Sequence, residues 1–336
     1  MRNHKLQNSM KKLLLLLATV GLLAVACTPG GVDEDNNGNS TEQSGGDNDN
    51  GGNVKPANDE IWYTSSDSNI ITPNSSAFGA NIISNTYENG RGIITFDAPI
   101  TNIGEEAFAE CTTLTSLTIS DSIINIGKLA FLGCSSLANI TLPNSVSSIG
   151  ECAFYACTSL TSVSIPNSVI SFGNSIFAAC ESLESFCSQF ASNDNRCLII
   201  DGELNSFAPS GLTKYDIPYS VTSIGYYAFC GCSLLTRITI PNSVTSIANR
   251  SFWFCTSLTS ITIPYSVTKI GENAFYNCSS LTSVYCKPTT PPIGNESMFY
   301  DNASGRKIYV PRNSVSAYKS ASYWSDYASN IVGYDF

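Results

Sequence analysis

Apolar residues recur along most of this chain at a fixed spacing, and residues 258–278 hold the clearest copy of the pattern. Within that copy the apolar positions are Leu258, Ile261, Ile263, Val267, Ile270, Ala274, Phe275 and Cys278. The same Phe position recurs, mostly in steps of 23 residues, at Phe252, Phe229, Phe177, Phe154, Phe131 and Phe108. A unit of this length buries its apolar face only by stacking on neighbouring copies. The pattern therefore predicts a solenoid.

Each copy contains the same succession of short elements, which residues 160–177 illustrate. Residues 160–165 alternate apolar and small polar side chains, a pattern that predicts a β-strand. Pro166 follows, and because proline has no N–H to donate, it ends the strand. A second extended piece ends at Gly173, which tolerates a positive φ at the next bend, and we expect one helical turn around Phe177. Strands of adjacent coils can then pair in parallel.

The regular step fails between Phe177 and Phe229, which are 52 residues apart. Counting back from the following coils places the six extra residues within 184–211. In this segment Asp201 and Gly202 stand between two short apolar runs, a signal for a tight hairpin. We therefore expect an irregular coil whose hairpin projects from the solenoid or widens it.

Both ends of the array depart from the repeat. Residues 61–99 read as two or three short strands broken by Gly, Asn and Pro turns. Residues 312–336 read as a short helix, with Tyr318 and Trp324 folding over the end of the array. Since terminal units of a solenoid must close its ends with a different surface, we expect an N-terminal and a C-terminal cap around a solenoid that spans 100–311.

The repeat resembles the BspA-type leucine-rich repeats of bacterial surface proteins, whose unit reads close to LTSITIPxSVTSIGxxAFxxCxS. The copies that match almost residue for residue begin at Leu137, Leu160, Leu235 and Leu258, and the resemblance covers about 100–320. In single coils, Ser120 replaces the proline of the unit and Ala248 replaces its glycine. The resemblance implies a right-handed, curved leucine-rich-repeat solenoid of the α/β type and, commonly, adhesion or recognition at a surface. It implies no particular ligand.

Residues 1–26 have the features of a secretory signal peptide, namely a basic start, an apolar run and small residues at the end. The apolar run is shorter than the roughly 20 residues that span a bilayer. Residues 24–27, AVAC, resemble the lipobox of bacterial lipoproteins, in which the cysteine becomes the lipidated first residue. The resemblance implies an N-terminal lipid anchor at Cys27. An ordinary signal peptide followed by a chance cysteine is the alternative.

Residues 27–60 are rich in Gly, Asn, Ser and acidic residues, a composition that predicts a disordered linker. Asp33, Glu34 and Asp35 resemble the acidic export signal by which some bacterial lipoproteins reach the cell surface. A solvated charge run is the alternative. We expect an extracytoplasmic protein that is lipid-anchored to the outer membrane and exposed at the cell surface.

The charge balance argues against several classes of partner and activity. The formal net charge of −10 falls to about −14 once residues 1–26 are removed, and no basic block exists to bind nucleic acid. His4, the only histidine, lies in the predicted signal peptide, which excludes Ser-His-Asp and Cys-His catalysis and His-containing zinc sites. A carboxylate pair or a Ser-Lys dyad stays formally open, but no constellation points to one. We expect no enzyme activity, no cofactor and no metal ion.

Thirteen cysteines in an exported protein normally suggest a disulfide framework. Seven of them occupy equivalent positions in the coils: Cys111, Cys134, Cys157, Cys180, Cys232, Cys255 and Cys278. Because free Cys behaves as a small apolar residue, we predict a ladder of buried free thiols. Coils about 4.8 Å apart leave disulfide pairing along the ladder as the alternative. Cys187 and Cys197 flank the irregular loop and are the expected bridge.

The outward positions of the predicted strands form a uniform surface of small, uncharged side chains. They read Thr115, Ser116, Thr118, then Thr161, Ser162, Ser164, then Thr259, Ser260, Thr262. The side chains that vary this surface are Lys214, Asp216, Arg237 and Tyr285. Interface anchors are enriched in Trp, Tyr and Arg, and this surface largely lacks them.

Large aromatic side chains gather off the strands in the C-terminal half, at Tyr219, Tyr226, Tyr227, Trp253, Phe254 and Tyr265. These positions are free of the core pattern, so we predict that they form one contact patch for a protein or glycan ligand. The alternative is that the aromatic rings cover one another and stiffen the convex side. If Trp253 and Phe254 are mostly buried, or if Tyr219 and Tyr265 point away from them, no patch exists and the strand surface becomes the expected binding site.

The sequence therefore favours a binding or adhesion module that recognises host or surface macromolecules through one face of a solenoid. A passive structural spacer on the cell surface is the first alternative. A carboxylate-based glycan-processing enzyme is the second, and the regular coils offer no cleft for it.

Overall fold

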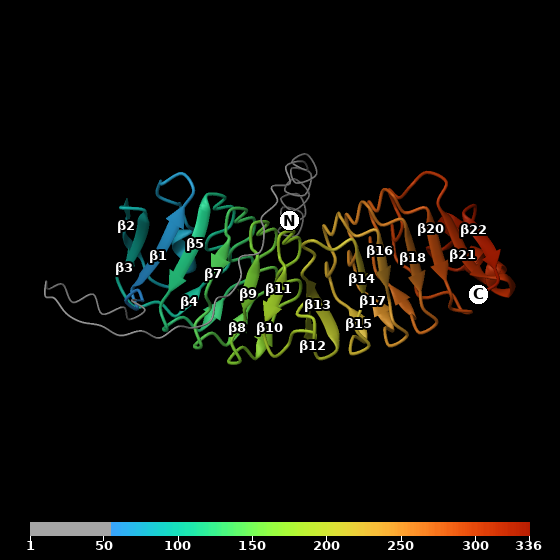
Figure 1. Ribbon diagram of the computed structural model, residues 1–336, viewed down its shortest axis with the longest axis horizontal. Helices are drawn as coiled ribbons and strands as arrows, with labels where there is room; N and C mark the ends of the chain where they lie inside the picture. Colours follow the sequence, from blue (N-terminus) through green and yellow to red (C-terminus); the bar gives the residue numbers. More distant parts are fainter. Residues whose placement is uncertain (1–54) are drawn as a thin grey trace, which may run out of the picture. The chain divides into compact units, whose positions relative to one another are not determined.

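The computed structural model describes residues 55–336, and Pro56–Phe336 form one compact unit in which about ten coils stack side by side (Figure 1). The predicted solenoid of parallel strands and 23-residue coils is confirmed. The predicted signal peptide 1–26, the lipidated Cys27, the acidic residues 33–35 and the predicted linker up to residue 54 lie outside the described residues.

The first side of the coils consists of parallel strands from the Leu-x-x-Val-x-Ile segments. The strands are β5 (Leu114–Ile119), β7 (Asn139–Ile140), β9 (Ser162–Ser164), β11 (Ser185–Cys187), β14 (Lys214–Asp216), β16 (Arg237–Thr239), β18 (Ser260–Ile263), β20 (Ser283–Cys286), β21 (Lys307–Pro311) and β22 (Ile331–Tyr334). Ser260 lies opposite both Arg237 and Ser283, so equivalent residues of successive coils are in register. The outward side of these strands is called the strand face below.

The second side of the coils is a ladder of two-residue strands. They are β4 (Asn102–Ile103), β6 (Asn125–Ile126), β8 (Ser148–Ile149), β10 (Ser171–Phe172), β15 (Ser223–Ile224), β17 (Ser246–Ile247) and β19 (Lys269–Ile270). A glycine follows several of them, as at Gly173, but its φ is not positive as the sequence suggested. A Cβ on Gly173 would collide with the backbone N of Glu151 in the preceding coil. Glycine is needed there because two backbones approach closely.

The third side of the coils consists of the segments around the repeated Phe, which we call the outer turns. We expected helical turns, but each outer turn contains two left-handed residues four positions apart, such as Cys152 (φ 54°) and Ala156 (φ 58°). Left-handed residues interrupt an α-helix. The backbone instead bonds to the next coil, as from Phe154 N to Ile176 O at 2.9 Å. The outer turns therefore hold the coils together much as a parallel sheet does.

The interior contains two ladders that run along the stack of coils. The repeated Phe rings stack face to face, with centroids 5.0 Å apart for Phe131–Phe154 and 5.1 Å for Phe154–Phe177. Beside them five of the ladder thiols donate a hydrogen bond to the Phe carbonyl of the preceding coil, as from Cys157 Sγ to Phe131 O at 3.2 Å; the five are Cys134, Cys157, Cys180, Cys255 and Cys278. Cys111, in the first coil, donates to Thr72 O instead. The described cysteines are all free, which confirms the free-thiol ladder.

The bridge predicted between Cys187 and Cys197 is wrong, because the two side chains face different surroundings. Cys187 is exposed at the end of β11. Cys197 begins strand β12 and is buried in the core, where its Sγ lies 3.2 Å from the hydroxyl of Tyr215.

The irregular coil contains the predicted hairpin. Strands β12 (Cys197–Ile200) and β13 (Glu203–Phe207) pair antiparallel around Asp201 and Gly202, both with positive φ, which confirms it. This coil has no outer turn. Instead the buried side chains of Asn205 and Ser206 accept hydrogen bonds from the backbone N–H groups of Ile176 (3.3 Å) and Phe177 (3.2 Å). The Ser206 hydroxyl thus replaces the carbonyl that the next regular coil would supply to Phe177, as Ile176 O does for Phe154 N.

The two ends of the unit carry additional elements. The N-terminal end contains β1 (Glu60–Ser65), the short 3-10 helix η1 (Ser75–Ala77), β2 (Ile82–Glu88) and β3 (Arg91–Phe96). Strand β1 pairs antiparallel with β5 of the first coil on one side and with β3 on the other, and β2 pairs antiparallel with β3. At the C-terminal end are η2 (Arg312–Ser314), α2 (Val315–Ser320) and η3 (Ser325–Tyr327). Tyr318 and Trp324 are fully buried and donate hydrogen bonds to the carbonyl groups of Pro288 and Pro292. These contacts close the end of the core.

Candidate functional site

The strand face of the N-terminal half is uniform in its chemistry. Its outward side chains include Thr115, Ser116, Thr118, Asn139, Thr141, Thr161, Ser162 and Ser164, all exposed or half-buried. Near the first coil their hydroxyl groups bond to one another, as between Thr64 Oγ1 and Thr115 Oγ1 at 2.6 Å. Short hydroxyl side chains without charge or rings offer few of the contacts that anchor a ligand.

The strand face of the C-terminal half carries charged and aromatic side chains. Lys214 on β14 lies directly opposite Arg237 on β16, and both are exposed. Like charges on adjacent strands destabilise a sheet. Asp216 follows on β14, while Lys307 occupies β21. The strand face therefore changes from neutral to largely basic along the solenoid, although the whole chain has a net charge of −10.

An aromatic cluster occupies the end of the same face. The rings of Tyr285 on β20 and Tyr309 on β21 stack with centroids 4.8 Å apart, and Tyr334 on β22 packs edge-on against both. Phe336 extends the cluster, and it and Tyr334 are each 42% exposed. Half-exposed aromatic rings in contact are typical of interaction surfaces.

From the sequence, Tyr285 was identified only as a departure from the uniform strand surface, and Tyr309 and Tyr334 were missed. The one residue added before Phe299 shifts the last unit, so Tyr309 follows Tyr285 by 24 residues instead of 23. The pairing of Tyr285 with Tyr309 shows that both occupy the same position on successive strands.

The six aromatic residues predicted to form one patch lie on different sides of the coils. Tyr219 and Tyr265 are 79% and 55% exposed, at the corners that follow β14 and β18. The other four belong to the outer turns. There Tyr226 is 40% exposed and Phe254 is half-buried, whereas Tyr227 and Trp253 are buried. The single continuous patch therefore does not form.

The reason for this burial is the missing outer turn of the irregular coil. The outer turn of Tyr227 lies directly against that of Ser175, whose Oγ donates a hydrogen bond to Tyr226 O. The Tyr227 ring then reaches Tyr155 (centroids 5.9 Å apart) on one side and Trp253 (5.6 Å) on the other. These rings cover one another, as the alternative interpretation expected.

A groove on the strand face lies beside the exposed Tyr219, and we call it the corner groove. Its volume is about 360 Å³. Its polar and aromatic lining consists of Tyr219, Arg237, Thr239, Asn242, Ser260, Thr262 and Lys287, and the remaining lining residues are Ile238, Ile240, Pro241 and Pro264. The ammonium of Lys287 lies 5.5 Å from the ring centroid of Tyr265, a cation–π contact that orients it. No carboxylate lines the corner groove.

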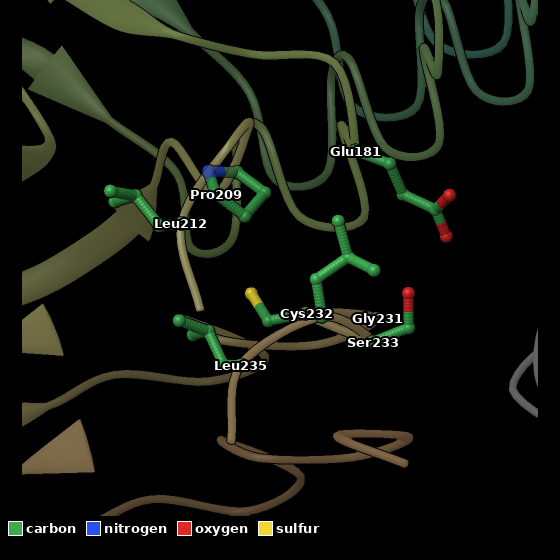
Figure 2. Close-up of a pocket in the computed structure, with 8 residues that line it drawn as sticks. Glu181, Pro209, Leu212, Gly231, Cys232, Ser233 and Leu235 are labelled. Carbon is green, nitrogen blue, oxygen red and sulfur yellow. The ribbon is translucent and has the colours of Figure 1, made fainter. Parts of the chain in front are cut away.

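A second cavity lies at the irregular coil, between Pro209 and Leu212 on one side and Cys232 and Leu235 on the other (Figure 2). Its volume of about 50 Å³ is far below the roughly 300 Å³ at which ligand pockets begin. A ligand of ordinary size does not fit in it.

The described residues show little that suggests chemistry. Partial burial raises the pKa of the Glu181 and Glu203 carboxyl groups, but Glu181 follows an outer turn and Glu203 begins β13 beside Gly225. Within residues 55–336 no group of three or more His, Cys, Asp or Glu side chains is placed to hold a metal ion. In the same part of the chain no helix is both long and apolar enough to cross a membrane.

Comparisons with known proteins agree with this architecture. Residues 66–195 and 203–327 match the family model of the BspA type leucine rich repeat region, in six copies. No curated protein matches the chain. Solenoids of this fold are typical of binding proteins that are not enzymes.

Solved structures of bacterial repeat proteins are similar. A leucine rich cell surface protein from Faecalibacterium prausnitzii A2-165 is 26% identical with a TM-score of 0.50, over 64% of this chain and 65% of that chain. A leucine-rich repeat protein from Eubacterium ventriosum is 22% identical (TM-score 0.38), over 57% and 64% of the two chains. The pneumococcal vaccine antigen PcpA is 18% identical (TM-score 0.43), over 65% of each. The chain thus spans slightly less than two thirds of the length of each of these three proteins.

Proposed function

Because this chain belongs to the family of BspA-type leucine-rich-repeat proteins, we propose that it is a cell-surface binding or adhesion module. The ligand is a protein or glycan of a host or of the surrounding surface, and the strand face of the C-terminal half recognises it. The observation that carries the proposal is the change in that face, from Ser, Thr and Asn in the first coils to Lys, Arg and Tyr in the last ones.

The placement of the aromatic cluster supports a binding role over a purely structural one. A spacer needs only coils that stack, and the first half achieves this with small polar side chains on the same face. Tyr285 and Tyr309 stay partly exposed although Thr or Ser would satisfy the same strand positions. Rigid rings contribute contact area at low entropic cost, which favours recognition.

Binding of the purified chain to arrays of host matrix proteins and glycans tests the proposal. We expect at least one saturable ligand, whose affinity falls by at least about tenfold in the double variant Tyr285→Ser with Tyr309→Ser, as hot-spot truncations do. The matched control is Thr141→Ala with Ser164→Ala on the N-terminal half, which should bind like the unchanged chain. Absence of any saturable ligand would instead favour the passive spacer, and release of reducing sugar from a bound glycan would favour the glycan-processing enzyme.

The position of Cys27 supports a membrane-anchored display of this module at the outer membrane. The proposed anchor is a lipid on Cys27, and the predicted linker that follows it would hold the solenoid away from the membrane. In cells, Cys27→Ser should abolish acyl labelling and release the protein from the membrane fraction. We also expect protease added to intact cells to degrade the unchanged protein, because the proposal places the protein on the outer leaflet. Full membrane retention of Cys27→Ser would rule out the lipid anchor.

A further inference from the structure

We propose that the corner groove binds an acidic polysaccharide, through sugar units that carry carboxylate groups. This inference deepens the proposed function, on which it rests, by naming the chemical class of the ligand. The groove combines two cations, a row of hydroxyl groups and one exposed aromatic ring, and each of these features suits a different part of such a sugar.

The two cations of the groove, Arg237 and Lys287, are free to bind an anion. Neither takes part in the ion pairs found within residues 55–336, which join Lys128 to Glu151, Arg250 to Glu272 and Arg312 to Asp335. Arg237 is exposed on β16, and its planar guanidinium matches a carboxylate through two parallel hydrogen bonds. Asp216 is the carboxylate on the neighbouring β14, but it does not line the groove.

The spacing of the cations favours a ligand that carries repeated negative charge. Arg237 stands on β16 and Lys287 follows β20, so their strands are two spacings apart, or about 10 Å. Lys287 also lies four residues beyond Ser283, the position in register with Arg237, which adds about 13 Å along the strands and places the two backbone positions roughly 16 Å apart. An extended chain with a carboxylate on successive units can therefore contact both cations at once. Lys287 is held toward the groove by its contact with the Tyr265 ring, which reduces the entropy that binding would cost.

The rest of the lining suits a sugar better than a peptide. Thr239, Ser260 and Thr262 present hydroxyl groups, and Asn242 presents an amide, all able to bond with sugar hydroxyls. Tyr219, 79% exposed, offers a ring face on which the apolar side of a pyranose can pack. A peptide that binds by adding a strand needs a free sheet edge, but β16 is already paired with β14 and β18.

Calorimetric titration of the purified chain with trigalacturonate tests the inference. Galactotriose, which lacks the carboxylates, and triglutamate, an acidic peptide, serve as comparison ligands. We expect trigalacturonate to bind saturably, with an affinity that falls as the salt concentration rises. Galactotriose should bind at least about tenfold more weakly because it makes no charged hydrogen bonds, and triglutamate should bind at least about tenfold more weakly because it lacks the sugar hydroxyls and the apolar face of a pyranose.

Variants of the lining identify the site. Arg237→Gln and Lys287→Gln should each weaken trigalacturonate binding by about tenfold or more, with unchanged thermal unfolding because both side chains lie at the surface. The matched control Lys269→Gln removes an equal charge from β19 on the second side of the coils and should leave the affinity unchanged.

Three results would overturn the inference. The first is that trigalacturonate shows no saturable binding, and the second is that Lys269→Gln weakens its binding as much as the groove variants do. The third is that triglutamate binds as tightly as trigalacturonate and depends equally on Arg237, which would make the groove a peptide site. If an array ligand binds through Tyr285 and Tyr309 but trigalacturonate does not bind, the proposed function stands and only the acidic polysaccharide is rejected as the ligand of the corner groove. Failure of every array ligand would reject the proposed function itself.

Discussion

Asn302 Nδ2 donates a hydrogen bond to the carbonyl oxygen of Phe275 at 2.7 Å. In the preceding coil the thiol of Cys278 donates to the carbonyl of Phe252 at 3.1 Å, and Cys134, Cys157, Cys180 and Cys255 make the same contact in their own coils. Asn302 stands where the pattern expects Cys, so an amide replaces the thiol and keeps the same acceptor satisfied. The amide also has an oxygen, which accepts a hydrogen bond from Arg306 Nη1 at 3.1 Å.

Truncation of Asn302 should therefore destabilise the last coils. We expect Asn302→Ala to lower the free energy of unfolding by about 1–3 kcal/mol, because a buried carbonyl and the Arg306 guanidinium both lose a partner. Asn302→Cys should recover part of this loss, since a thiol serves the same acceptor elsewhere. Urea denaturation measures both, with the exposed Asn144→Ala as a control that stays within about 0.5 kcal/mol. Equal stability of Asn302→Ala and the control would contradict the prediction.

The Phe ladder provides a second prediction. Phe154 is fully buried between the stacked rings of Phe131 and Phe177. We expect Phe154→Ala to cost about 3–5 kcal/mol, because it removes a ring and leaves a cavity that regular coils cannot collapse to fill. Thr161→Ala, on the exposed strand face of the next coil, should be neutral within about 0.5 kcal/mol. Denaturant midpoints that ranked these two variants the other way round would refute the register.

The repeat was readable from sequence because every coil places the same residue types in the same surroundings. Leu160, Val163 and Phe154 recur at 23-residue intervals and are all buried, so the period alone predicted strand register and core. The outer turns were harder, because their conformation depends on pairs of left-handed residues that no single residue type marks. Positions 152 and 156 are Cys and Ala, yet both have positive φ. The backbone of a neighbouring coil, not local propensity, holds them there.

The candidate site depended on long-range contacts that spacing does not reveal. Trp253 was expected to be exposed because its position lies outside the apolar pattern of the repeat. The irregular coil lacks an outer turn, however, and Tyr227 and Trp253 are buried against each other beside it. Tyr309 was missed for the opposite reason, since a one-residue insertion hid its alignment with Tyr285. Breaks in a repeat thus determine which unusual side chains are buried and which stay exposed.

The free thiols should differ sharply in reactivity. Among the twelve cysteines of residues 55–336, Cys187 alone is exposed. Burial raises the pKa of the Cys111 thiol to about 11 and that of Cys180 to about 12, so little thiolate exists at pH 8 even where reagent penetrates. We expect a thiol reagent at pH 8 to label Cys187 rapidly and the others only after unfolding, as peptide mapping would show. Cys187→Ser should remove the rapid label, and rapid labelling of Cys180 in the folded chain would contradict the ladder.

The irregular coil should have a distinct dependence on pH. Partial burial opposes ionisation of Asp194, but hydrogen bonds from the Ser192 hydroxyl, the Arg196 N–H and the Tyr215 hydroxyl (3.0 Å) outweigh it and hold the pKa of this carboxyl below its ordinary value of 3.8. A carboxyl with a lowered folded-state pKa contributes stability above its unfolded pKa and loses it as the pH falls through the folded pKa.

We therefore expect Asp194→Asn to unfold at a lower temperature than the unchanged chain at pH 7. The difference should shrink as the pH falls below 3.8, because the carboxyl of the unfolded chain then takes up a proton while the folded one still resists it. The advantage over the neutral amide is lost once the pH has fallen through the lower pKa of the folded state. Thermal unfolding followed by circular dichroism between pH 7 and the acid limit measures this, and Asn193→Ser, an exposed neighbour without a titratable group, is the control. A difference that stays constant over the whole range would show that Asp194 acts through its shape and not through its charge.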